Sequence, residues 1–503
     1  MLRVWVDSGI RKVIIATDDK SVKGMLEPLH SEVKYVPWFK KKTLVKEVVR
    51  LYDNYWVDPS TGYHVLELGL GWSSLILGMF RSYISQEDSD NLIRDALVSN
   101  SYRTFPFPEL RDYQNEDVLH MLKYKIGLFS CYTSYGKTQT IATMANYFAS
   151  SGKKVLLVTP GKKAKDELVK RCKNVFNLDM DSKKTPSNVS CIITSGLLNR
   201  SDYTDISKRQ DLINWLHSFE VVLSDEVEYT INDAGEFIYS NVINASILYG
   251  FSGTADKKGG EMITFSNGIS DVVIRNKKLI TYFGPSLVYR LPLNISIDSI
   301  EVKTSSLDSL DFSGIDEKKD SSSSVYSFVM ERIWTNSFVC RLITKLIDKF
   351  PKLFIPINNL NSILSHWIDN YFIGRYRVLL VCGEGYIYHD LDGNRSKLTL
   401  QEACDKIAAN EVDVIPSTSS GYRALDFPGI ENIFLIEGSI GGVVLQSIGR
   451  VARGSHMNIV TLGSKAGKKI PIYTKSDEKR KELFKNYYKT CELTESIIFE
   501  EKL

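Results

Sequence analysis

Short apolar runs alternate with stretches of helical spacing along most of this chain after about residue 100. Five runs occur before residue 300, at 126–131, 154–158, 190–194, 221–223 and 247–251. Strands that are apolar on both faces and alternate with helices are typical of a parallel sheet covered by helices on both sides. This part of the pattern therefore predicts one α/β lobe.

The same alternation resumes in the second half of the chain. Helical spacing covers 338–350 and 398–410, and strand-like runs lie at 353–357, 377–382, 412–415, 432–436 and 459–462. A second α/β lobe is predicted from this pattern. Between the two blocks, residues 303–324 are rich in Ser, Asp and Lys, which is typical of a linker or loop.

The two ends of the chain differ from these blocks. Residues 1–100 combine a strand-like run at 12–16 with a helical stretch at 43–52, and they predict a small mixed α/β accessory domain. The basic tail predicts a helix around 477–489. The expected organisation, in order, is 1–100, 101–302, 303–324, 325–464 and 465–503.

Composition narrows the class of protein. With 503 residues, 43% hydrophobic and 24% charged, the chain is too long for one core and too apolar for a disordered protein. The 63 Lys and Arg against 60 Asp and Glu leave a net charge of +3. Bulk charge therefore neither requires nor excludes a nucleic-acid partner.

Cysteine usage and apolar segments bear on the compartment. The seven cysteines form no Cys-x-x-Cys pair, which argues against a zinc site or a disulfide framework. The N-terminus lacks a signal-peptide core, and the most apolar stretch, 66–80, is too short for a membrane span and contains Glu67. We expect a soluble monomer in the cytoplasm, that of the host cell if the chain is phage-encoded.

A phosphate-binding loop is predicted where the run 126–131 meets a helical stretch. The connecting residues read Cys131-Tyr132-Thr133-Ser134-Tyr135-Gly136-Lys137-Thr138. In a strand–loop–helix of this kind, backbone N–H groups around Ser134 and Gly136 cradle the phosphates of ATP. Lys137 reaches the β and γ oxygens, and Thr138 ligates Mg²⁺. Cys131 stands where a glycine is usual, and a surface turn is the alternative interpretation.

An acidic turn supplies the carboxylates that such a site needs. The apolar run at 219–224 leads directly into Asp225-Glu226-Val227-Glu228. Asp225 would hold Mg²⁺ through water, and Glu226 would polarise the attacking water. An acidic surface loop is the alternative interpretation. The turn follows the phosphate loop by about 90 residues and comes directly after an apolar strand, which favours an ATPase site.

The order of motifs resembles that of superfamily 2 helicases. Leu110-Arg111-Asp112-Tyr113-Gln114 is similar to their Q element, which implies that Gln114 pairs with adenine. Gly250-Phe251-Ser252-Gly253-Thr254-Ala255 resembles motif III. The resemblance implies two tandem RecA-like parallel-sheet lobes that close on ATP and Mg²⁺, so the expected fold class is α/β with a small mixed α/β domain in front.

The strongest match lies near the end of the second block. Gln446-Ser447-Ile448-Gly449-Arg450-Val451-Ala452-Arg453 resembles the QxxGRxxR motif VI. The resemblance implies that Gln446 contacts the nucleotide and that Arg450 and Arg453 stabilise the transferring phosphoryl group. Two arginines three residues apart share one helix face.

Further segments resemble the nucleic-acid motifs of this superfamily. They include Val158-Thr159-Pro160-Gly161-Lys162 (motif Ia), Thr194-Ser195-Gly196, residues 353–357 (motif IV) and Ser417-Thr418-Ser419-Ser420-Gly421 (motif V). The resemblance implies backbone phosphate contacts from Thr159, Pro160, Ser195, Gly196, Thr418 and Ser419. In the N-terminal domain, the aromatic-basic cluster at 38–42 predicts a further contact through Lys40 and Lys41, with a solvated lysine face as the alternative.

Within the superfamily, the chain is most similar to the phage UvsW-like helicases, which act on branched DNA. The shared features are a small N-terminal domain and the stretch Val381-Cys382-Gly383-Glu384, which is similar to the SGE segment of that group. This resemblance implies an ATP-dependent DNA helicase or translocase that unwinds or branch-migrates forks and four-way junctions in replication, recombination or repair. Glu228, Ala424 and Ala255-Asp256-Lys257 depart from the usual residues of motifs II, V and III.

Other functions stay open. One is an RNA helicase or duplex translocase, and another is a nucleic-acid-binding scaffold without ATPase activity, against which Lys137, Glu226 and Arg450 argue. A third follows from Gly69-Leu70-Gly71, which resembles the first motif of an S-adenosylmethionine methyltransferase. That motif needs an acidic strand end about 20 residues later, whereas 86–90 has the character of a polar loop, so core packing of a small domain is favoured.

Overall fold

A computed structural model describes most of the chain as two compact units. One unit covers residues 1–131 and 136–290, and the other covers mainly residues 291–503. The described residues are 2–7, 9, 11–20, 31–38, 43–50, 55–99, 103–131, 135–176, 188–199, 204–253, 261–263, 272–274, 277–290, 296–304, 330–357, 366–382, 385–418, 429–435, 456–464 and 491–498. No helix among them is long and apolar enough to cross a bilayer.

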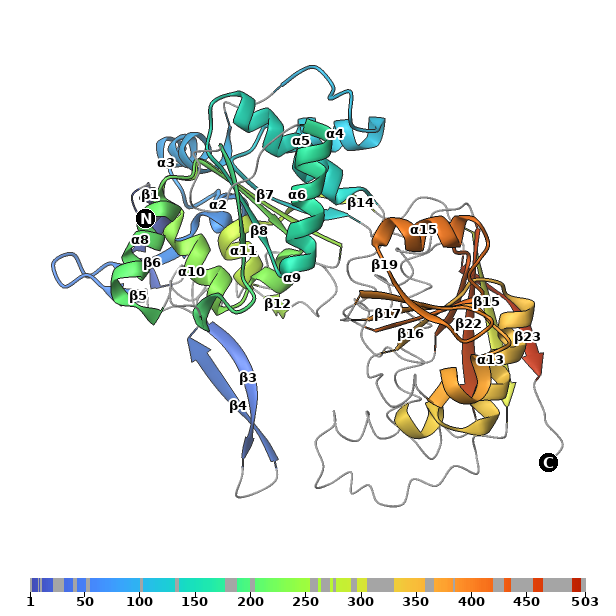
Figure 1. Ribbon diagram of the computed structural model, residues 1–503. Helices are drawn as coiled ribbons and strands as arrows, with labels where there is room; N and C mark the ends of the chain where they lie inside the picture. The colour runs from blue at the N-terminus through green and yellow to red at the C-terminus, as the bar shows by residue number, and fades with distance from the viewer. Residues whose placement is uncertain are drawn as a thin grey trace. The chain divides into compact units, whose positions relative to one another are not determined.

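The chain begins with a small antiparallel sheet. Its strand order is β1-β2-β6-β5, with bounds Leu2–Asp7, Lys12–Thr17, His64–Gly69 and Tyr55–Val57. The elements after it are η1 (Leu70–Trp72), α2 (Ser73–Phe80), α3 (Gln86–Leu92) and the π-helical turn η2 (Ile93–Leu97). A separate hairpin pairs β3 (Ser31–Trp38) with β4 (Thr43–Arg50) (Figure 1).

Two predictions for this domain are wrong. The stretch expected to be helical at 43–52 is strand β4, because its valines suit a strand that pairs along its whole length with β3. The expected polar loop at 86–90 is helix α3. The Ser85 hydroxyl oxygen accepts the Asp88 N–H at 3.0 Å, and this N-cap starts a helix whose acidic first turn suits the helix dipole.

The first large sheet has six strands, all parallel, in the order β14-β7-β11-β10-β8-β9. Their bounds are Ser286–Arg290, Ile126–Cys131, Ile247–Ser252, Val221–Asp225, Val155–Thr159 and Val189–Ile193. Each of the five strands predicted in this part of the sequence is present, within two residues at either end. They form the parallel α/β lobe that the apolar runs predicted.

Helices cover this sheet on both faces (Figure 1). They include α4 (Asp112–Met121), α5 (Lys137–Ser150), α6 (Lys162–Phe176), α8 (Ile206–His217), α9 (Val227–Thr230), α10 (Asp233–Asn241) and α11 (Lys277–Phe283). Shorter elements are η3 (Leu197–Asn199) and the pair β12 (Glu261–Ile263) and β13 (Val272–Ile274). Buried apolar residues of α8, α10 and α11 pack on one face, whereas α5 and α6 contact β8, β9 and β10.

The N-terminal domain packs directly on the first lobe through the turn Gly69-Leu70-Gly71. A Cβ atom on Gly69 would overlap the carbonyl oxygen of Thr281, and one on Gly71 would overlap that of Ile280, so both positions need glycine for close approach to α11. The fully buried Trp72 donates its Nε1–H to the Thr281 hydroxyl at 3.2 Å. The Gly-x-Gly turn is therefore a packing contact, as the core-packing interpretation expected.

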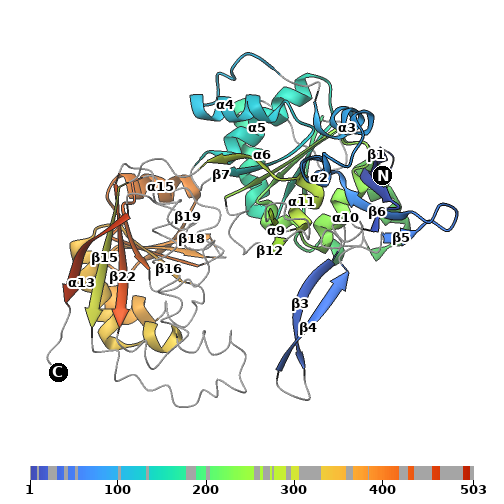
Figure 2. The ribbon, with the colours of Figure 1, turned by 180° about the vertical axis from the view of Figure 1, so that it is seen from behind.

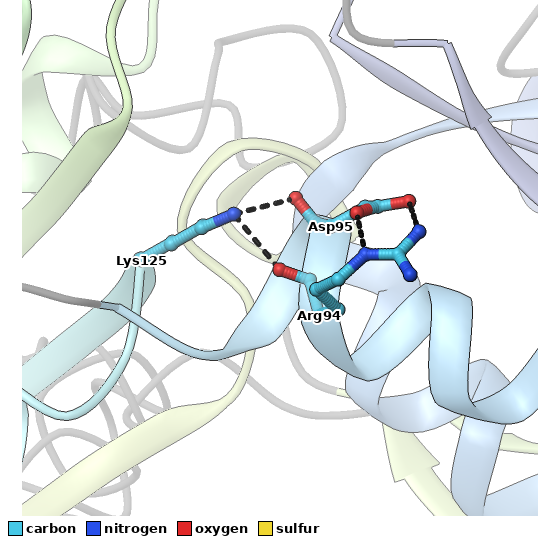
Figure 3. A network of polar contacts seen from close by, with 3 residues as sticks. All are labelled: Arg94, Asp95 and Lys125. Atoms are coloured by element: carbon cyan, nitrogen blue, oxygen red, sulfur yellow. Dashed lines mark hydrogen bonds and ion pairs between the residues drawn. The ribbon is translucent and has the colours of Figure 1, made fainter.

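A second contact ties the end of this domain to the start of β7. The Lys125 ammonium donates to the backbone carbonyl oxygens of Arg94 at 2.9 Å and Asp95 at 3.0 Å (Figure 3). These carbonyls belong to η2, near whose end a cation is favourable. Because the N-terminal domain is held at both η1 and η2, it forms one compact unit with the first lobe.

The second unit contains a nine-stranded mixed sheet in the order β19-β18-β17-β20-β16-β21-β22-β15-β23. The bounds are Arg395–Leu398, Gly385–His389, Val378–Cys382, Val414–Thr418, Leu353–Ile357, Asn432–Leu435, His456–Ser464, Ser296–Thr304 and Cys491–Ile498. Helix α13 (Ser337–Lys349) and turn η6 (Ile368–Phe372) pack on one face and α15 (Leu400–Ala408) on the other (Figure 2). The strands and both helices predicted for this block are confirmed.

Two details of this unit differ from the sequence prediction. Strand β15 pairs in parallel with β22 and β23, so residues 296–304 belong to the second sheet rather than to the first lobe and the linker. The described part of the tail, 491–498, is strand β23 instead of helix, and the helix expected at 477–489 lies outside the described residues. Both segments become strands of the second sheet because they pair with strands that are distant in the sequence. The composition of a segment by itself does not reveal such pairing. The predicted α/β fold of two parallel-sheet lobes after a small N-terminal domain is confirmed, with the difference that β18 and β19 add an antiparallel edge to the second sheet.

We expect Gly71→Ala to lower the free energy of unfolding of the first unit by about 2 kcal/mol or more, because the added methyl group overlaps the α11 backbone. Gly78→Ala is the matched control. Gly78 lies within α2 and has open space around it, so alanine should stabilise by up to about 1 kcal/mol. Urea unfolding followed by tryptophan fluorescence measures both variants. Equal midpoints would contradict the packing role of the turn.

Candidate active site

Three adjacent strands bring the predicted nucleotide motifs together. In the parallel register, Phe129 of β7 lies beside Phe251 of β11, and Phe251 lies beside Asp225 of β10. Parallel strands all end at the same sheet edge, where ligands of open α/β sheets bind. The phosphate loop, the acidic turn and motif III therefore leave the sheet side by side.

The phosphate loop enters α5 through a left-handed residue. Gly136 has φ 95° and ψ 33° and is the N-cap of the helix. Glycine adopts this conformation without strain. A Cβ atom there would lie 2.6 Å from Gln114 Nε2, which is a second reason for glycine. Lys137 and Thr138 follow as the first two residues of α5, as the strand–loop–helix prediction requires.

The acidic turn has the same backbone feature on a residue that is not glycine. Glu226 links β10 to α9 with φ 48° and ψ 53°. A non-glycine residue in this region costs of order 1 kcal/mol or more, and such strain is concentrated at functional sites. Its carboxylate oxygen Oε1 lies 3.4 Å from Lys137 Nζ, and the two side chains are only 14% and 10% exposed. The structure thus joins the predicted phosphate-binding lysine and the predicted catalytic glutamate in one buried ion pair.

The charges of this cluster depend on one another. Burial alone would lower the pKa of Lys137, but the nearby charges of Glu226, Asp225 and Glu228 outweigh burial and the pKa lies above its usual value. Burial, followed by the charge of Glu226, raises the pKa of Asp225. Lys137 therefore stays charged at neutral pH, whereas Asp225 is a carboxylate that a cation would stabilise.

This donor set fits Mg²⁺. Carboxylate and hydroxyl oxygens are the ligands that Mg²⁺ prefers. Asp225, at the end of β10, supplies a carboxylate, and the partly exposed Thr138, at the start of α5, supplies a hydroxyl. Cys131, in place of the usual glycine, is buried at the end of β7. Burial raises the pKa of its thiol, so the group stays protonated and acts as a small apolar residue.

Gln114 lies against the phosphate loop. Its Oε1 accepts the Arg111 N–H at 3.0 Å, which is one half of a capping box at the start of α4. Its Nε2 donates to the Gly136 carbonyl oxygen at 3.4 Å and to the Thr140 hydroxyl at 3.3 Å. The predicted adenine-reading amide is thus placed beside the loop, and its role with adenine stays a prediction.

The loops after β8 and β9 are neighbours, as the nucleic-acid motifs require. The N–H groups of Thr194 and Ser195 donate to the carbonyl oxygens of Thr159 at 3.0 Å and Pro160 at 3.2 Å. Ser195 and Gly196 are exposed, whereas the Thr159 side chain is fully buried. Of the four residues predicted here, Ser195 and Gly196 therefore present the most surface to a strand.

Sequence reasoning missed a group of hydroxyls beneath the acidic turn. The Tyr239 hydroxyl lies 2.6 Å from both Ser224 Oγ and Thr230 Oγ1, and the latter two are 3.0 Å apart. Ser224 precedes Asp225, and Thr230 ends α9, so the triangle holds both sides of the turn that carries Glu226. Tyr239 comes from α10, and no sequence spacing links it to motif II.

The remaining predicted site residues are only partly described. Thr418 ends β20, which lies between β17 and β16, the strand at 353–357 that was predicted as motif IV. The other predicted residues lie outside the described part of the chain. They are Ser134, Gln446, Arg450, Arg453, Ser419, Lys40 and Lys41.

No family model matches the sequence, and no curated protein does. Solved structures that match include UvsW of bacteriophage T4, at 15% identity over 99% of each chain with a TM-score of 0.39. Dbp5 of S. cerevisiae bound to RNA and ADP BeF3 matches at 11% identity over 77% of this chain and 89% of that chain, with a TM-score of 0.45. The Hef helicase domain of Pyrococcus furiosus matches at 12% identity over 73% of this chain and 98% of that chain, with a TM-score of 0.41.

These matches agree with the predicted resemblance to superfamily 2 helicases of the UvsW-like kind. Each of these three identities is below 25%, and each TM-score is below 0.5.

We expect Tyr239→Phe to lower the free energy of unfolding of the first unit by about 1–3 kcal/mol, because two buried hydroxyls lose a shared partner. Tyr282→Phe is the matched control. Within the described part of the chain, the hydrogen-bond partner of the Tyr282 hydroxyl is the exposed Ser240 hydroxyl, at 3.4 Å, so its loss should change stability by about 0.5 kcal/mol or less. Denaturant unfolding of the two variants tests the difference, and equal effects would show that the triangle contributes nothing.

Proposed function

We propose that this chain is an ATP hydrolase of the superfamily 2 helicase type that uses ATP and Mg²⁺ to move along or unwind nucleic acid. The observation that carries the proposal is the buried ion pair between Lys137 and Glu226, 3.4 Å apart at the sheet edge where β7, β11 and β10 end. Lys137 starts the helix that follows β7, and Glu226 follows β10, which is separated from β7 by β11. A cation for the phosphates and an acid for the attacking water are the two groups that phosphoryl transfer to water needs.

The chain's own residues account for the steps. Lys137, charged because of the surrounding carboxylates, would bind the β and γ phosphate oxygens together with the backbone around Gly136. That contact would release Glu226 from its ion pair, so that its carboxylate can accept a proton from the attacking water. Thr138 and Asp225 would hold Mg²⁺, which neutralises charge on the phosphates. Gln114 would contact adenine beside the loop.

The second unit would complete the site through motif VI. We propose that Arg450 and Arg453 stabilise the charge of the phosphoryl group in the transition state and that Gln446 contacts the nucleotide. Because these residues belong to the other lobe, hydrolysis would depend on both lobes binding ATP. Each cycle of ATP hydrolysis would then move the lobes along a nucleic-acid strand whose phosphates contact Ser195, Gly196 and Thr418.

The finer proposal is that the substrate is branched DNA, with roles in branch migration, recombination or repair. What supports this choice is the sequence resemblance to the phage UvsW-like group. An RNA helicase or a duplex translocase would use the same ATP site, so the choice between them depends on which nucleic acid stimulates turnover.

We expect Lys137→Ala to reduce ATP turnover by at least about 10²-fold while nucleic-acid binding is retained, because the change removes the cation that contacts the transferring phosphate. Lys153→Ala is the matched control. Lys153 makes only a partly exposed ion pair with Glu220, at 3.9 Å, so turnover should stay at the wild-type value. A phosphate-release assay measures both, and wild-type turnover in Lys137→Ala would refute the phosphate-loop assignment.

Glu226→Gln separates chemistry from binding. We expect ATP to bind while turnover falls by about 10²-fold or more, because the amide cannot act as a general base. Equal turnover in Glu226→Gln and wild type would assign the base to another group.

The substrate is identified by stimulation of the same reaction. We expect turnover to rise most with four-way-junction or forked DNA, less with single-stranded DNA and least with single-stranded RNA. A preference for RNA would make the chain an RNA helicase, and no turnover with any of these would leave a binding scaffold.

A further inference from the structure

A cavity of about 420 Å³ lies where the N-terminal domain meets the first lobe. One wall comes from β2 and β6 with the turn after it, and the other comes from α10, α11 and the start of β11. Helix α11 and β6 contact one another, so the cavity is bounded within one compact unit. Its volume falls in the range of about 300–1,000 Å³ that is usual for small-molecule sites.

Arg11 lines this cavity and has no ion-pair partner among the described residues. Burial lowers the pKa of its guanidinium to about 10, and no carboxylate contributes an opposing effect. Within the described residues, no Asp or Glu forms an ion pair with Arg11. Arg11 is partly buried, and a guanidinium that is partly removed from water and has no ion-pair partner is stabilised when an anion binds beside it.

The backbone of Arg11 supports a specific role for this residue. Arg11 has φ 52°, in the left-handed region that a long side chain rarely adopts, at the turn between β1 and β2. The pairing of Asp7 with Lys12 fixes that turn. Glycine or asparagine would be less strained there, so the strain that arginine accepts points to a function of its side chain.

The other lining groups suit a ligand with a charged and an apolar end. Lys12 adds a second cation to the lining, but it is paired at 2.9 Å with Glu67, which also lines the cavity, so the net charge of the three residues is that of Arg11. The exposed hydroxyl of Ser240 lies on the lining. The remaining lining includes aliphatic and aromatic side chains: Leu70, Ile243, Leu248, Tyr239 and Tyr282.

We propose that this cavity binds a nucleotide, with the phosphate on Arg11 and the base or sugar against the apolar and aromatic lining. An arginine fork matches phosphate geometry, and aromatic rings suit a base. The site is separate from the phosphate loop: Leu248, which lines it, is the second residue of β11, whereas the ATP site lies at the opposite end of the same strands. The nucleotide is either free or one unit of a nucleic-acid strand.

Equilibrium binding of two probes to the full chain, measured by calorimetry at low salt, tests the proposal. The probes are AMP and a 5′-phosphorylated thymidylate tetramer, each tested alone. Arg11→Ala should raise the Kd of whichever probe binds to the wild type by at least about tenfold, because the phosphate loses a charged hydrogen-bond partner. Ser240→Glu should weaken binding too, because a carboxylate at this exposed lining position repels phosphate. It also provides a second test if Arg11→Ala folds poorly.

Two controls separate this site from the phosphate loop. Arg81→Ala makes the same charge change at an exposed position outside the cavity and should leave binding unchanged. Lys137→Ala alters the phosphate loop alone, so the weakening caused by Arg11→Ala should be the same in the Lys137→Ala background as in the wild type. Binding of AMP with this pattern identifies a free nucleotide as the ligand, and binding of the tetramer identifies a unit of a strand. Unchanged binding in Arg11→Ala, or no binding of either probe to wild type, would overturn the proposal.

Discussion

The register between three neighbouring parallel strands is the constraint on which the candidate active site depends. Strand β11 lies between β7 and β10, so the loops after all three strands leave the sheet at one edge. A slip of one residue would turn Asp225 to the opposite face of the sheet, because strand side chains alternate. Buried apolar residues on both faces prevent that slip. Core packing thereby fixes the place of Lys137 relative to Glu226.

The acidic turn is held in a strained form by contacts on either side of it. The left-handed backbone conformation of Glu226 costs a conformational free energy of order 1 kcal/mol or more. Its ion pair with Lys137, the hydrogen bond from its N–H to the Asp225 carboxylate and the hydroxyl triangle below the turn offset that cost. These contacts fix the backbone of the turn, so that Glu226 is already at the sheet edge before a phosphate would replace its carboxylate as the partner of Lys137, and such preorganisation suits the proposed reaction.

The N-terminal domain is part of the first lobe in physical terms. Its core includes Ile280 of α11, and Trp72 and the glycine turn after β6 complete the contact. The same close approach that requires glycine at Gly69 leaves the cavity beside Arg11, since Gly69 lines it. One packing contact therefore joins the two domains and bounds a cavity that is separate from the phosphate loop.

The sequence by itself determined the alternation of strands and helices, the strand–loop–helix around Gly136 and the acidic turn at Asp225. Each of these is encoded by neighbouring residues, through apolar runs, glycine and the start of a helix. Only the tertiary structure decided the sheet order, the partners of β15 and β23, and the contact of Tyr239 with Ser224 and Thr230. The physical reason is that these features join residues that are distant in sequence, and the free energy of burying them together is not recorded in local periodicity.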